Sequence, residues 1–145
     1  MKNEIANQSI YLFLQYGYKS VTMDDIAKHM GMSKKTIYIH FPTKEELVEQ
    51  CAMDHLDEIV KRINIISKHS KDPIIELYQI KKEALNHLSN EKHSPQYQLQ
   101  KYYSSLYSKL KEKEFKILGA LFSNSISKGM QTGIFRQSID IDFVV

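Results

Sequence analysis

The chain has 145 residues and a formal net charge of +3; 42% of the residues are hydrophobic and 26% are charged. This composition is ordinary for a folded, water-soluble protein, and the length suits one domain or a small module fused to a larger one. The single cysteine excludes an internal disulfide and a cysteine-rich zinc site, and it fits a reducing compartment. No signal-peptide core and no apolar run of membrane-spanning length is present, so we expect a cytoplasmic protein with no membrane partner.

Three short helices are predicted within the first 41 residues. Apolar residues repeat there at helical spacing, and each segment is bounded by residues that commonly begin or end a helix. Hydroxyl side chains occupy the N-cap positions of the second and third helices, and one of them forms a capping box with an acid three residues later. Glycine or proline follows the end of each helix. In chain order, the boundary residues are Gly17, Thr22, Gly31, Ser33 and Pro42.

The remainder of the chain predicts longer helices. Thr43 opens a second capping box with an acid three residues on. Asp72–Pro73 and Ser94–Pro95 each combine an N-cap residue with proline at the first helical position. No alternation typical of a strand is found, so the fold class is all-α. The expected helices run from Thr43 through Ile63, from Pro73 to about His93, from Pro95 to about Lys109 and from about Lys111 to Met130.

Residues 22–41 have the layout of a DNA-binding helix-turn-helix, two short helices joined by a tight turn that contains glycine. Ala27 is small where the helices must cross closely, and Gly31 supplies the backbone conformation of the turn. Ile37 and Phe41 are assigned to the core. The side chains left facing outward are donors and aromatics, which can reach phosphates and base edges in a major groove. These are Ser33, Lys34, Lys35, Thr36, Tyr38 and His40.

The local charge supports the same interpretation. Between Asp25 and Glu45 the sequence contains no carboxylate, so a cationic face is expected on a nearly neutral protein. Its lysines are Lys28, Lys34, Lys35 and Lys44. Two alternatives remain open: the lysines solvate an ordinary helical hairpin, and the chain is a protein–protein interaction module without specific DNA binding.

The stretch from Phe13 to Leu47 resembles the TetR/AcrR family of repressors over about the first third of the chain. The resemblance implies a helix-turn-helix DNA-binding domain over residues 1–46, followed by a helical ligand-binding and dimerisation domain over residues 47–145. Ile39 departs from the pattern, because the family usually has a polar or aromatic residue there; it could touch a thymine methyl group. The matching positions are Gly17, Thr22, Ile26, Ala27, Gly31, Ser33, Tyr38, His40, Phe41 and residues 44–47.

The resemblance also implies roles for individual residues, as phosphate contacts or as contacts to base edges. The phosphate contacts would come from Thr22, Tyr38, His40 and Lys44. The residues at base edges would be Lys34, Lys35 and Thr36. The partner would be double-stranded DNA, and the mechanism would be repression that a small-molecule inducer relieves.

An aromatic cluster in the later helices is a possible inducer site. In the resembling family such residues line a cavity between long helices, so we expect an elongated apolar pocket. The alternative for each residue is a place in the core of the bundle. The residues concerned are Tyr78, Tyr102, Tyr103, Tyr107 and Phe122.

No catalytic triad, phosphate-binding glycine loop or metal-ligand pattern is found in the sequence, so we expect neither an enzyme nor a cofactor. Cys51 is interpreted as a small buried residue rather than a reactive thiol. Near the end of the chain, Ser138 or Asp140 caps a new helix that stops after about one turn. We therefore expect a shortened chain, and a complete protein that binds a near-palindromic operator as a homodimer.

Overall fold

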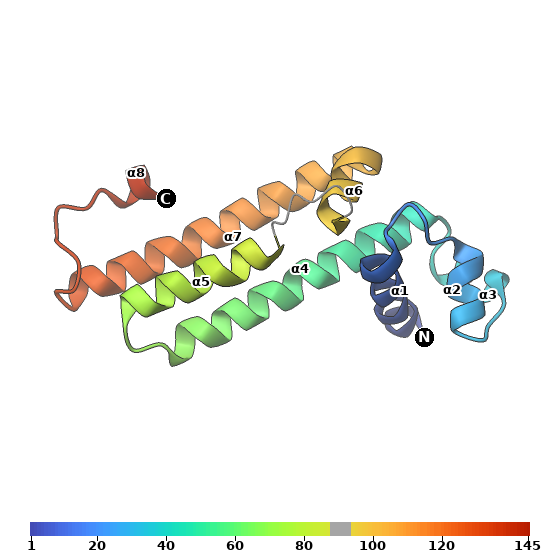
Figure 1. Ribbon diagram of the computed structural model, residues 1–145, viewed down its shortest axis with the longest axis horizontal. Helices are drawn as coiled ribbons and strands as arrows, with labels where there is room; N and C mark the ends of the chain where they lie inside the picture. The colour runs from blue at the N-terminus through green and yellow to red at the C-terminus, as the bar shows by residue number, and fades with distance from the viewer. Residues whose placement is uncertain (88–93) are drawn as a thin grey trace. The chain divides into compact units, whose positions relative to one another are not determined.

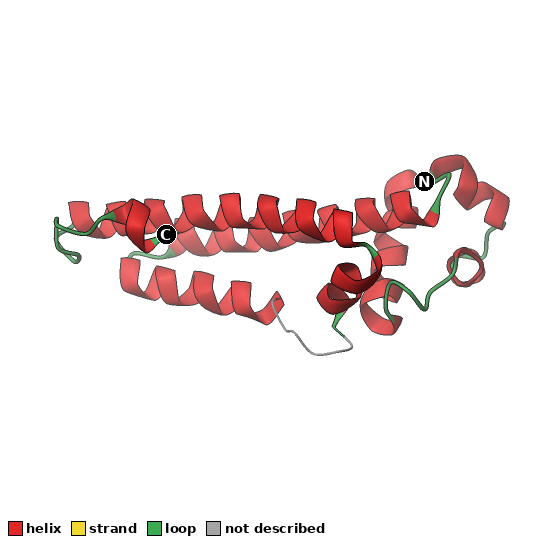
Figure 2. Cartoon of the chain, turned by 90° about the horizontal axis from the view of Figure 1, so that it is seen from above, coloured by secondary structure: helices red, strands yellow, loops and turns green. Residues whose placement is uncertain are grey.

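The computed structural model describes residues 1–87 and 94–145, without the side chains of Asn86 and His87. The described part consists of eight α-helices without a strand (Figures 1 and 2), so the predicted all-α fold is confirmed. None of the helices in these ranges is long and apolar enough to cross a membrane. In chain order, the helices are α1 (Lys2–Tyr16), α2 (Met23–His29), α3 (Lys34–His40), α4 (Lys44–His69), α5 (Pro73–His87), α6 (Pro95–Tyr102), α7 (Ser104–Gln131) and α8 (Ile141–Val144).

The helices form two compact units. The first unit contains residues 1–56 and the described part of residues 89–110, and the second contains the described part of residues 57–88 with residues 111–145. The helices α4 and α7 each contribute residues to both units. The division predicted between residues 46 and 47 falls within the unbroken helix α4, and it stays a prediction.

The first unit buries one apolar face of each of its N-terminal helices. Phe13 of α1 is fully buried and packs against Tyr18, with 5.1 Å between the ring centroids. Burial also raises the pKa of the Tyr18 phenol. The spacing of Leu12, Phe13 and Tyr16 predicts that all three share the inner face of α1, but Tyr16 is 58% exposed, because it is the last residue of α1 and the chain turns at Gly17. The other fully buried anchors of this core include Ile5, Ile26, Ile37, Leu47 and Val48.

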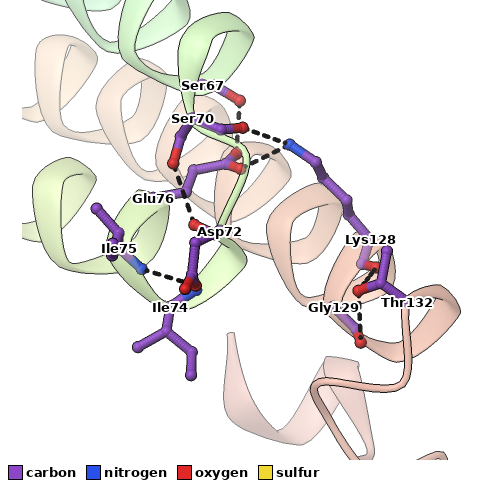
Figure 3. A network of polar contacts seen from close by, with 9 residues as sticks. All are labelled: Ser67, Ser70, Asp72, Ile74, Ile75, Glu76, Lys128, Gly129 and Thr132. Atoms are coloured by element: carbon purple, nitrogen blue, oxygen red, sulfur yellow. Dashed lines mark hydrogen bonds and ion pairs between the residues drawn. The ribbon is translucent and has the colours of Figure 1, made fainter.

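The second unit has a core of isoleucines and a buried carboxylate. Ile59 and Ile63 of α4 pack with Ile80 of α5, and leucine and phenylalanine side chains of α7 cover them. Glu76 is only 2% exposed, and its carboxylate accepts hydrogen bonds from Ser67 Oγ (2.6 Å) and Lys128 Nζ (3.0 Å) (Figure 3). These contacts join α4, α5 and α7. A buried charge is tolerated when it is paired and hydrogen-bonded in this way.

Two predicted helix boundaries differ from the observed ones. The break expected at residues 109–111 is wrong: α6 ends at Tyr102, and Tyr103 leaves the helical conformation with φ −137° and ψ 51°. Residues 109–111 contain neither glycine nor proline, and Leu110 is buried, so α7 continues through them. The expected end of α5 near His93 lies outside the described residues. At the end of the chain Asp140 is the N-cap of α8, and its side chain accepts a hydrogen bond from the Phe143 backbone N–H at 3.2 Å.

Candidate nucleic-acid interface

Thr22 fixes the beginning of α2 through a complete capping box. Its hydroxyl oxygen accepts a hydrogen bond from the Asp25 backbone N–H (3.1 Å), and the Thr22 backbone N–H donates to Asp25 Oδ2 (2.8 Å). The Thr22 hydroxyl also donates to this carboxylate at 2.7 Å. This last hydrogen bond is the main reason that the pKa of Asp25 is lowered. The predicted capping box is therefore confirmed, and it sets the position of the Thr22 side chain.

The turn between α2 and α3 has the geometry that the sequence predicts. Gly31 has a φ of +63°, a conformation that side chains with a Cβ rarely adopt. The Met32 backbone N–H donates to the Ala27 carbonyl at 3.0 Å, and Ala27 is only 6% exposed at the crossing. Ser33 then caps α3 by accepting a hydrogen bond from the Thr36 backbone N–H at 3.1 Å. The two helices therefore form a helix-turn-helix.

The helix α3 has one buried side and one exposed side. Ile37 is fully buried and Phe41, the C-cap residue, is 2% exposed, as predicted. On the other side, Lys35 is exposed, Tyr38 is 40% exposed and Ile39 is 69% exposed. Because the buried side anchors the helix, the exposed side is held as a fixed surface.

Lys34 on α3 makes an ion pair within the unbound chain. Its Nζ donates to Asp24 Oδ2 at 2.8 Å, and this hydrogen bond raises the pKa of the lysine. The same ammonium lies 6.0 Å from the centroid of the Tyr38 ring. A phosphate or a base edge would have to compete with Asp24 for this ammonium.

Lys44 at the beginning of α4 is directed at the backbone of the α1–α2 connection. Its Nζ donates to the Lys19 carbonyl at 3.2 Å. Burial lowers the pKa of Lys44, and the Lys19 ammonium lowers it further. Lys19 lies outside the cationic stretch of residues 26–44, so it is not among the candidate residues that the sequence predicts. Its position two residues after the helix-ending Gly17 is the one feature of the sequence that marks it.

All eight residues predicted to contact DNA belong to the first unit. One is the N-cap of α2, one begins α4, and the other six lie at the N-cap or on the body of α3. Their DNA contacts stay a prediction. In chain order they are Thr22, Ser33, Lys34, Lys35, Thr36, Tyr38, His40 and Lys44.

The five aromatic residues predicted for a ligand pocket are divided between the units. Tyr102, Tyr103 and Tyr107 belong to the first unit, and Tyr78 and Phe122 belong to the second. Tyr78 is 67% exposed, whereas Phe122 packs against the isoleucine core. Burial raises the pKa of the Tyr103 phenol, and the nearby Glu45 carboxylate adds to the effect. The pocket itself stays a prediction.

The single cysteine, Cys51, lies in a buried environment. Cys51 is fully buried, and its thiol donates to the Ala6 carbonyl at 3.3 Å. Burial raises its pKa to about 12, in agreement with the prediction of a small buried residue. Within residues 1–87 and 94–145, no cluster of His, Cys, Asp or Glu could hold a metal ion.

The fold and this surface define a helix-turn-helix protein with a further helical domain. Residues 5–51 match the model for bacterial regulatory proteins of the tetR family. Over residues 5–51 the chain is therefore similar to the TetR family.

Among curated proteins, the chain is similar to a negative transcriptional regulator of the biofilm operon icaADBC, IcaR. The Staphylococcus aureus (strain Newman) protein is 36% identical over 77 residues, which cover 51% of this chain and 41% of the relative. The Staphylococcus epidermidis protein is 35% identical over 65 residues, which cover 42% of this chain and 35% of the relative. The matched stretch therefore spans less than half of these relatives.

Solved structures share the fold over nearly the whole chain. A transcriptional regulator from Saccharomonospora viridis in complex with choline has a TM-score of 0.80 and 20% identity, and the match covers 99% of this chain and 76% of that one. The regulator FadR from Bacillus subtilis in complex with stearoyl-CoA has a TM-score of 0.72 and 18% identity, with coverage of 99% and 78%. At this level of identity, the likeness establishes the fold alone: a helix-turn-helix module followed by a further helical domain.

Proposed function

We propose that this protein is a DNA-binding transcriptional repressor. The observation that carries the proposal is the exposed side of α3, where lysine and aromatic side chains are displayed while Ile37 anchors the helix from behind. A helix held in this manner can enter a major groove with its donors directed at base edges and phosphates. The cationic stretch from residue 26 to residue 44 favours a polyanion over a neutral partner.

A small-molecule ligand would release the protein from its operator. The support comes from the similar folds, since one of the solved relatives holds choline and another holds stearoyl-CoA. The later helices would supply the pocket, with the five aromatic residues as its first candidates. The active form would be a homodimer on a near-palindromic operator in the cytoplasm, and the protein would not be an enzyme.

The test begins with duplexes that the unaltered chain selects from a random-sequence pool. Their affinity should fall steeply as salt rises, because phosphate contacts release counterions. Lys35→Ala should weaken binding to the selected duplex by about 1–3 kcal/mol, and much less to random DNA, because Lys35 would face a base edge. Equal losses on both duplexes would make Lys35 a backbone contact instead.

Lys44→Ala tests the phosphate contact at the beginning of α4. It should weaken binding equally on both duplexes and lower the slope of log affinity against log salt by about one. Lys116→Ala removes the same charge from an exposed position on α7 and is the matched control. If no duplex is enriched and affinity is independent of salt, the chain is a protein–protein interaction module and the proposal fails.

A further inference from the structure

Gln98 of α6 contacts the connection between α1 and α2, although 79 positions separate it from Lys19. Its Oε1 accepts a hydrogen bond from the Lys19 backbone N–H at 3.1 Å. The amide group lies against Gly17, which is buried, and a Cβ at this glycine would collide with it. The φ of +93° is what favours glycine at this position, and the end of the flexible Gln98 side chain fills the space beside it.

Lys19 makes three contacts, all of them with residues of the first unit. Gln98 takes its backbone N–H, the Lys44 ammonium donates to its carbonyl at 3.2 Å, and its own ammonium lies 5.4 Å from the centroid of the Tyr102 ring. Two of these partners come from α6, which lies beyond the stretch that matches the TetR family. The third begins α4. The connection from Gly17 to Val21 thus contacts both α4 and α6.

This connection leads directly into the helix-turn-helix. Thr22, the N-cap of α2, follows Lys19 by three residues, and Val21 between them is buried. A shift of the Lys19 peptide would therefore be passed to the beginning of α2. Preorganised contacts of this kind raise affinity because their ordering cost is met before the ligand binds.

We infer that Gln98 is a positioning residue for DNA binding, which holds the α1–α2 connection, and with it the beginning of α2, through the Lys19 peptide. The inference rests on the proposed function and extends it to a residue outside the helix-turn-helix. Gln98 touches no DNA in this role. It acts through Lys19, and its hydrogen bond favours the arrangement that DNA requires.

The test compares three substitutions on α6. Gln98→Met keeps the size of the side chain and removes the hydrogen bond, whereas Gln98→Glu keeps an acceptor for the Lys19 N–H. Gln100→Met is the matched control, because Gln100 is exposed on the same helix. Hydrogen exchange of the Lys19 amide, the thermal midpoint and the affinity for the duplex selected by the unaltered chain are measured for each.

We expect faster exchange at Lys19 and an affinity about three- to tenfold lower in Gln98→Met, the effect of one hydrogen bond. The thermal midpoint should stay close to that of the unaltered chain. Gln98→Glu should restore both the exchange rate and the affinity, and Gln100→Met should change neither.

Faster exchange with unchanged or higher affinity would overturn the inference while leaving the proposed function intact. An affinity loss that follows the thermal midpoint, and that Gln98→Glu does not rescue, would also overturn it, since it would show a stabilising role alone. If the unaltered chain selects no duplex at all, the proposed function itself fails, and the role of Gln98 in DNA binding fails with it.

Discussion

The N-caps around the helix-turn-helix and the ion pairs between helices of the second unit span different distances along the sequence. Each N-cap of the helix-turn-helix and of α4 bonds to a residue three positions later, in the pairs Thr22–Asp25, Ser33–Thr36 and Thr43–Glu46. The second unit instead joins separate helices, in the pairs Asp57–Lys113, Arg62–Glu83 and Glu76–Lys128. Local caps fix where each short helix begins, and therefore which side chains it exposes. Distant pairs fix how long helices pack, so the two regions should respond differently to the loss of one contact.

The largest effect is expected from Lys128→Met, which leaves the buried Glu76 carboxylate without its cation. Removing one partner of a buried pair is strongly destabilising. The Lys128 side chain is 42% exposed, so we expect a loss of only about 1–3 kcal/mol in the free energy of unfolding, measured with urea. Lys116→Met breaks an exposed pair with Glu112 on the same helix and is the control. An equal loss in the free energy of unfolding in the two variants would show that the buried ion pair contributes no more to stability than the exposed one.

A smaller effect is expected from Thr22→Val, which removes the cap and keeps the shape of the side chain. The expected loss of stability at neutral pH is about 1 kcal/mol. The lowered pKa of Asp25 adds a dependence on pH: its contribution is present above the ordinary carboxylate value, about 4, and is lost as the pH falls through the lowered folded value. As the pH is lowered in the acid range, the free energy of unfolding should therefore fall less steeply in Thr22→Val than in the unaltered chain. A steeper fall in the variant would contradict the assigned cause.

The smallest effect is expected from Asp24→Asn, which releases Lys34 from its exposed ion pair. Binding to random duplex DNA at low salt should tighten by about two- to fivefold, because a free ammonium replaces a neutralised one. Asp142→Asn removes the same charge from α8 and is the control. The difference between the variants should shrink as salt screens the surface. If the two variants bind alike, the Asp24–Lys34 pair does not compete with DNA.

The same contrast explains what the sequence could predict. The Thr22 capping box, the glycine turn at Gly31 and the buried Ile37 follow from spacings of four residues or fewer, and each was predictable. The Gln98–Lys19 contact depends on residues that meet only after the chain has folded. The end of α6 at Tyr103 carries no glycine or proline, so tertiary packing rather than a local breaker sets it.

The buried thiol gives this protein an internal reporter of its own motion. Cys51 is the single cysteine in the sequence, and it is covered where α4 meets the Ala6 carbonyl of α1. A thiol reagent can reach it only when this seam opens, so the labelling half-time measures how often α1 separates from α4. Because α1 packs against α2, comparing the labelling half-time with and without a duplex would show how far DNA binding reduces this opening.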